Sequence, residues 1–183
     1  AWSPDGSNLA WVSIRDLNLE IYTITLSDEM DFLNADRRTN SLARDWYPAW
    51  SPDGTKIVFS SDENGTENIY LIDIITGERT QLTFSDENTL HPFWSLEGDA
   101  IYFVRENEST LTEGTMDVYR MNLDGTEQTL QADDVIIAGD PVWSPNATHV
   151  AYVSNIEGTW QIYVSQADGS NLRRVTYGDA NFM

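Results

Sequence analysis

A short motif that recurs four times constrains the fold of this chain more than any other feature of its sequence. The first landmark of each copy is a tryptophan followed by serine, at Trp2, Trp50, Trp94 and Trp143. The second landmark is an aliphatic residue followed by tyrosine, at Tyr22, Tyr70, Tyr119 and Tyr163. Both landmarks recur every roughly 45 residues, which is the signature of a repeat architecture. The sequence therefore predicts four copies of one unit, at approximately 1–47, 48–91, 92–140 and 141–183.

The second copy indicates what one unit contains. The turn at 51–54 combines proline, which fixes φ, with a glycine that accepts a left-handed backbone. An apolar strand at 56–61, an Asn-Gly hairpin turn, an alternating strand at 68–74 and a polar strand at 79–84 follow. Four antiparallel strands in roughly 45 residues form one blade of a propeller. We therefore expect an all-β propeller of four blades, each with four antiparallel strands, in a single domain over 1–183.

The tryptophans should lie on the innermost strand of each blade and pack between neighbouring blades. The blade count leaves three arrangements open: a closed ring of four blades, half of an eight-blade homodimer, and part of a longer propeller. We favour the third arrangement, because natural rings usually close with strands from both termini in one blade.

Charge limits the classes of partner. The chain of 183 residues has 30 acidic and 10 basic side chains, a net charge of −20. Such a surface repels nucleic acids and anionic membranes, so we expect no nucleic-acid partner. No apolar run approaches the roughly 20 residues needed to span a bilayer, so membrane insertion is not expected. The absence of cysteine excludes thiolate metal sites and a cysteine nucleophile.

The motifs of the second unit, Trp-Ser-Pro-Asp-Gly at 50–54, Ile-Tyr at 69–70, Thr-Gly at 76–77 and Leu-Thr at 82–83, resemble the TolB-type (WD-like) β-propeller repeat. The resemblance extends over all four copies. It implies a noncatalytic scaffold that binds a protein or peptide at the channel mouth and loops, and it favours a periplasmic or extracellular location. Similar repeats form the gating propeller of prolyl-oligopeptidase-like peptidases. The alternative is therefore an accessory propeller whose catalytic domain lies outside this chain.

The candidate ligand-binding residues are those that do not repeat. Tyr47, His91 and Asp140 each precede the proline that leads into an inner strand, and Phe182 is their equivalent near the chain end. Repeat proteins vary such positions while the scaffold around them repeats, so we expect these four side chains near a channel mouth. The alternative is that they only begin a strand.

Several kinds of chemistry are not expected. The sequence has no Gly-x-Ser-x-Gly elbow and no glycine-rich phosphate loop, so we predict no catalytic residue and no cofactor. His91 and His149 occupy different phases of the repeat, which argues against a histidine metal site. The acidic segment 62–67 slightly resembles a calcium loop, but it lacks the glutamate at the twelfth position. Surface calcium binding stays an open alternative, while the predicted set of metal ligands is empty.

Four polar residues, Asp5, Asp53, Glu97 and Asn146, look like a carboxylate set. They occupy one turn position in four different blades, so we expect them to cap their own turns and not to converge on one site.

Overall fold

The structure is a computed structural model. It describes residues 1–15, 17–26, 34–106, 115–136, 138–144, 146, 148–154, 156–166 and 169–178. This part of the chain consists of β-strands and turns and has no α-helix. Accordingly, it offers no helix of sufficient length and apolar character to cross a membrane.

The strands form four antiparallel sheets in which neighbours in sequence are neighbours in space. Blade 1 holds β1 (Asn8–Ser13), β2 (Glu20–Thr25) and β3 (Asp36–Arg37). Blade 2 holds β4 (Asp45–Trp50), β5 (Lys56–Ser61), β6 (Asn68–Asp73) and β7 (Arg79–Gln81). Blade 3 holds β8 (Thr89–Trp94), β9 (Ala100–Glu106), β10 (Thr115–Asn122) and β11 (Thr129–Ile136). Blade 4 holds β12 (Ala138–Trp143), β13 (His149–Ser154), β14 (Gln161–Gln166) and β15 (Arg173–Arg174).

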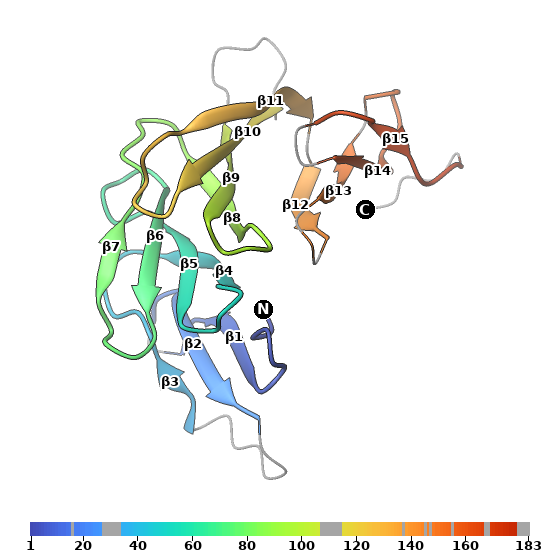
Figure 1. Cartoon of the computed structure of the whole chain (residues 1–183). Coiled ribbons are helices and arrows are strands. Elements are labelled where there is room, and N and C mark those ends of the chain that lie inside the picture. Colours follow the sequence, from blue (N-terminus) through green and yellow to red (C-terminus); the bar gives the residue numbers. More distant parts are fainter. Residues whose placement is uncertain are drawn as a thin grey trace.

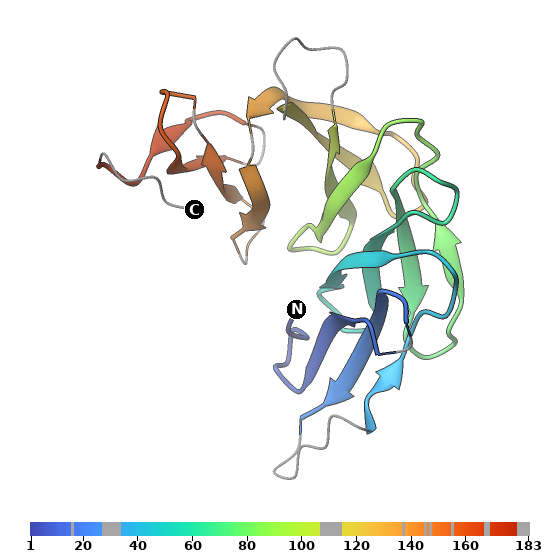
Figure 2. The ribbon, with the colours of Figure 1, turned by 180° about the vertical axis from the view of Figure 1, so that it is seen from behind.

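The blades follow one another along an open arc, with β4, β8 and β12 on its inner side and β7, β11 and β15 outside (Figures 1 and 2). In blade 1 the inner position is taken by the start of the chain, where Trp2 pairs with Leu9. The predicted all-β propeller of four antiparallel blades is confirmed. The arc stays open between blades 1 and 4 in both views.

The apolar core consists of three clusters, each shared by two neighbouring blades. Trp94 of blade 3 is 4% exposed, and its Nε1–H donates to the carbonyl of Ala49 in blade 2 at 3.1 Å. Trp143 of blade 4 stacks on Phe93 of blade 3, with ring centroids 5.7 Å apart. The predicted role of the tryptophans between blades is confirmed. Trp2 is 63% exposed, because no blade precedes it in the structure.

A buried threonine explains the Leu-Thr motif of the repeat. In blade 2 the Thr83 hydroxyl accepts the backbone N–H of Ile69 at 2.8 Å and donates to Asn68 Oδ1 at 2.9 Å. Thr39 and Thr176 make the same two bonds in blades 1 and 4, with Glu20 and Gln161 in the place of Asn68. In these three blades the threonine therefore ties the end of the outer strand to the neighbouring strand.

The Ser-Pro-Asp-Gly turns are closed by their own side chains. Asp53 accepts the Ser51 hydroxyl at 2.6 Å and the Thr55 N–H at 3.0 Å, and Gly54 has a φ of 71°. Asp5 and Asn146 make equivalent bonds in blades 1 and 4. The prediction of turn capping is confirmed for these three residues. In blade 3 it is wrong for Glu97, because Ser95 donates to Asp99 instead, at 2.7 Å.

Candidate functional site

The two predicted binding residues whose side chains the structure describes lie together. Tyr47 belongs to β4 and His91 to β8, and their ring centroids are 3.9 Å apart. Tyr47 is half-buried and His91 is 9% exposed. Residues 44 positions apart in the sequence therefore form one contact between the inner strands of blades 2 and 3.

Both residues hold an unusual backbone conformation. Tyr47 has a φ of 52° and His91 a φ of 50°. The left-handed region is uncommon for residues other than glycine; histidine adopts it more often than most, and for a bulky side chain such as Tyr47 it is a genuine outlier. Each residue also precedes a proline, which normally favours an extended backbone. Such strain persists where the surrounding structure imposes it, and it clusters at functional sites.

The strain coincides with a β-bulge in each inner strand. The β4–β5 register shifts between Trp46 and Ala49, and the β8–β9 register shifts between Leu90 and Phe93. A bulge leaves one residue without a partner opposite and re-aims its side chain. This explains how Tyr47 and His91 leave the alternation of their strands and meet each other.

Neighbouring side chains extend this contact into an aromatic row. The ring of Trp46 lies 6.4 Å from that of Tyr47, and the Arg44 guanidinium lies 5.6 Å from the Trp46 ring. Arg44 is held by Asp62, at 2.7 Å. The row thus combines the rings of Trp46, Tyr47 and His91 with the guanidinium of Arg44. It lies where the inner strands β4 and β8 begin, which we call their leading end.

The other two predicted residues stay predictions. The backbone of Asp140 lies in β12 within the register shift between Ala138 and Val142, which is the bulge position of blade 4. The side chain of Asp140 and the whole of Phe182 lie outside the described residues.

A buried carboxylate that the sequence did not reveal begins the same strand. Asp45 is 0% exposed, and neither of its oxygens makes a hydrogen bond of good geometry within the described residues, although the Ser61 and Thr39 hydroxyls lie near it. The Arg79 guanidinium lies 3.6 Å away. Burial raises the pKa of Asp45 to about 6, and the nearby Ser61 and Thr39 hydroxyls and Arg79 only partly offset it. The equivalent first residue of β8 is Thr89, so this buried charge is particular to the junction of blades 1 and 2.

A cavity of about 530 Å³ opens at the other end of the inner strands. Its lining residues come from the tryptophan turns of three blades: Trp2, Pro4, Trp50, Pro52, Phe93, Trp94, Ser95 and Leu96. We call it the aromatic cavity. Successive turns touch, since a Cβ at Gly98 would lie 3.5 Å from Pro52, but none of the four polar turn residues is among these lining residues.

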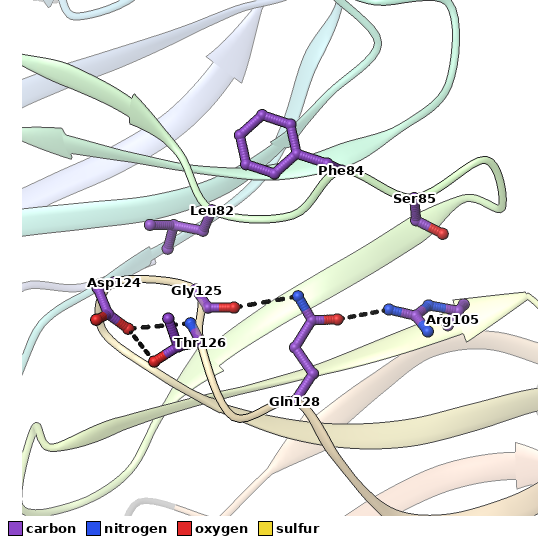
Figure 3. Close-up of a pocket in the computed structure, with 8 residues that line it drawn as sticks. All are labelled: Leu82, Phe84, Ser85, Arg105, Asp124, Gly125, Thr126 and Gln128. Atoms are coloured by element: carbon purple, nitrogen blue, oxygen red, sulfur yellow. Dashed lines mark hydrogen bonds between the residues drawn. The ribbon is translucent and has the colours of Figure 1, made fainter.

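A second cavity, of about 450 Å³, lies at the seam between blades 2 and 3 (Figure 3). Arg105 donates to Gln128 Oε1 at 2.7 Å, and Gln128 Nε2 donates to the Gly125 carbonyl at 3.2 Å. A Cβ at Gly125 would collide with the carbonyl oxygen of Leu82, so only glycine permits this approach. Because these polar groups bond one another, the seam is best explained as a structural junction.

The described residues hold no group of three histidine, aspartate or glutamate side chains placed to bind a metal ion. In the acidic segment 62–67, Asp62 pairs with Arg44 at 2.7 Å and Glu63 with Arg79 at 3.2 Å. These carboxylates therefore already have cationic partners.

Four antiparallel blades with repeated tryptophan turns define a β-propeller built from sequence repeats. The sequence model of a protein family, the TolB beta propeller domain, matches residues 1–112, which is more than half of the chain. The chain belongs to this family.

Three relatives illustrate how far the similarity extends. A protein TolB homolog of Chlorobium luteolum is 30% identical over 160 residues, covering 87% of this chain and 34% of the relative. Dipeptidyl-peptidase 5 of Porphyromonas gingivalis is 32% identical over 130 residues, covering 63% of this chain and 19% of the relative. An uncharacterized protein of Agrobacterium fabrum is 28% identical over 160 residues, covering 83% of this chain and 53% of the relative. The chain spans about half or less of the length of these curated relatives.

Solved structures share the fold. A TolB-like protein from Agrobacterium tumefaciens superposes with a TM-score of 0.77 at 23% identity, over 94% of this chain and 62% of the other. A puromycin-hydrolyzing peptidase of Mycobacterium tuberculosis superposes with a TM-score of 0.64 at 15% identity, over 95% and 27%. The chain is thus a TolB-like propeller domain that is also similar in fold to the propellers of prolyl-oligopeptidase-like peptidases.

Proposed function

We propose that this chain is a noncatalytic propeller module that binds a protein or peptide partner at the leading end of its inner strands. The observation that carries the proposal is the contact between Tyr47 and His91, two strained pre-proline residues with ring centroids 3.9 Å apart. Asp140 and Phe182 would extend the same site to the following blades. Membership of the TolB family supports a periplasmic or extracellular location.

Aromatic side chains suit this role. Tyrosine and tryptophan supply large contact areas with few rotatable bonds, and interface energies concentrate on such residues and on arginine. Tyr47, Trp46 and Arg44 provide these residue types side by side. The bulge holds Tyr47 in its bound orientation before a partner arrives, which lowers the entropy cost of association.

The test is a selection of displayed random peptides of about 12 residues on the intact chain, followed by affinity measurements on variants. We expect Tyr47→Ala to weaken the selected peptides by about tenfold or more. His91→Asn is the matching change in blade 3, because asparagine removes the imidazole ring and tolerates a positive φ. Tyr177→Ala is the control, since Tyr177 is 76% exposed and follows the outer strand of blade 4.

Two results would count against the proposal. The first is a selection that enriches no peptide beyond an unrelated protein. The second is a set of peptides that bind Tyr47→Ala and Tyr177→Ala equally well.

The ends of the arc support a second element of the proposal, a homodimer that completes a larger propeller. Leu82 is 2% exposed under blade 3, whereas Val175, at the same position in blade 4, is 48% exposed. At the blade 1 end of the arc, Trp2 is 63% exposed, whereas Trp94, at the same position in blade 3, is 4% exposed. Both end faces therefore repeat the surface that blades bury against each other. Sedimentation should give twice the chain mass of 20.7 kDa, and a monomer would remove the dimer from the proposal.

The accessory propeller of a peptidase is the second candidate. The 32% identity to dipeptidyl-peptidase 5 favours it. Reading the gene that encodes this chain distinguishes the two candidates. An α/β-hydrolase pattern in the same reading frame supports the accessory propeller, and a frame that holds propeller repeats without such a pattern supports the binding module.

A further inference from the structure

The aromatic cavity has the composition of a site for an organic cation. Three of its lining residues are tryptophans and one is a phenylalanine, and none of its lining residues is basic. Tryptophan offers the strongest attraction for a cation placed over its ring face. The volume of about 530 Å³ falls within the range of small-ligand sites.

Three acidic residues directly follow lining residues of this cavity in the sequence. Asp5 follows the lining residue Pro4, Asp53 follows Pro52, and Glu97 follows Leu96. All three acids are exposed. Hydrogen bonds from Ser3 and Ser7 lower the pKa of Asp5 to about 2, and bonds from Ser51 and Thr55 lower that of Asp53. Both turns are therefore negatively charged at neutral pH.

The structure also fixes the shape of the cavity. The bond from Trp94 Nε1–H to the Ala49 carbonyl, 3.1 Å long, sets the orientation of that indole. The turns that form the rim are closed by their own serine and aspartate side chains. A ligand thus meets a largely preformed site, which reduces the ordering cost of binding.

We propose that the aromatic cavity binds an arginine side chain of a peptide or protein partner. The apolar stem of arginine packs against the indole and proline faces, and its planar guanidinium stacks on an aromatic ring while facing the acidic turns. The net charge of −20 favours a basic partner over an acidic one. This site lies at the opposite end of the inner strands from Tyr47 and His91, so it goes beyond the proposed function.

The experiment titrates the intact chain with three acetylated, amidated tripeptides that differ only in the central residue between two alanines: arginine, citrulline or glutamate. Citrulline matches arginine in shape but has no charge. Tryptophan fluorescence reports binding, because three of the lining residues are tryptophans. We expect saturable binding of the arginine peptide, tighter than the citrulline peptide by about threefold to tenfold at low salt.

Two variants test the location of the site. Trp2→Ala removes an indole that is 63% exposed, so the fold should survive, and we expect arginine binding to weaken by about tenfold. Glu97→Gln removes one rim charge, for which we expect about a twofold loss. Phe84→Ala is the control, because Phe84 is 80% exposed but lines the seam cavity and not the aromatic cavity.

The proposal is overturned if the citrulline peptide binds as tightly as the arginine peptide, because charge would then have no role. It is also overturned if Trp2→Ala and Phe84→Ala bind alike, or if no peptide gives a saturable signal up to about 10 mM. Tyr47→Ala should leave arginine binding unchanged, which separates this site from the proposed peptide site.

Discussion

Replacing Asp45 by asparagine should stabilise the protein at neutral pH. The carboxylate of Asp45 is 0% exposed, and its pKa is raised from 3.8 to about 6. The folded state therefore binds the proton more tightly than the unfolded state, and stability falls as pH rises between these two values. A difference of about two pKa units corresponds to about 3 kcal/mol, lost once the pH exceeds the folded pKa. Asparagine keeps the shape of the side chain and carries no charge.

The assay is urea denaturation of wild type and Asp45→Asn at about pH 4.5 and about pH 7, and the quantity of interest is how their stability difference changes. We expect asparagine to gain about 2 kcal/mol relative to aspartate between these two conditions. Any pH-independent cost of asparagine cancels in this comparison. Asp36→Asn is the control, because that carboxylate is 70% exposed. Its stability difference should change by less than about 0.5 kcal/mol.

The reasoning fails if the stability difference between wild type and Asp45→Asn does not change with pH. It fails more clearly if asparagine loses stability relative to aspartate as the pH rises. That result would mean that Arg79, 3.6 Å away, stabilises the carboxylate by more than its burial costs.

Three further changes test the packing of the blades by urea denaturation. Gly125→Ala should destabilise the protein by about 3 kcal/mol or more, because the new Cβ would collide with the Leu82 carbonyl. Gly65→Ala is the control, since Gly65 has a φ of 87° but open space around it, and should cost only about 1–2 kcal/mol. Equal losses would refute the close contact. Trp143→Ala, in the blade 3–4 core, should cost about 3–5 kcal/mol and Leu42→Ala, at a fully exposed side chain, under about 1 kcal/mol, and similar values would contradict the packing between blades. Thr83→Val leaves the Ile69 N–H without its partner and removes one of the two donors to Asn68 Oδ1, which keeps the Ser85 N–H, so it should cost about 1–3 kcal/mol, whereas the exposed Thr80→Val should cost almost nothing; a neutral Thr83→Val would show that this hydroxyl is dispensable.

Repetition explains why so much of the fold could be predicted. A residue type that recurs at the same position of all four repeats has the same structural role in each. The tryptophans and the Ser-Pro-Asp-Gly turns could therefore be recognised as parts of the scaffold. The same comparison pointed to Tyr47 and His91 as positions free to vary, and the structure brings these two into contact.

The features that the sequence did not reveal arise from packing between blades. The rule for residues before proline favours an extended backbone at Tyr47 and His91, and the bulges override it. Asp45 looks like one more acid in an acidic chain, and its burial becomes visible only when blade 1 covers it. The sequence identified the tryptophan turns as separate copies of one motif, and the aromatic cavity becomes visible only when turns of three blades are placed together.

The most direct test of the central claim is hydrogen–deuterium exchange on the intact chain with and without the tightest selected peptide. Binding at the leading end of the inner strands predicts slower exchange in 44–47 and 88–91, with β7 and β15 unchanged. Slower exchange confined to the outer strands, or to the turns around the aromatic cavity, would contradict a peptide site formed by Tyr47 and His91.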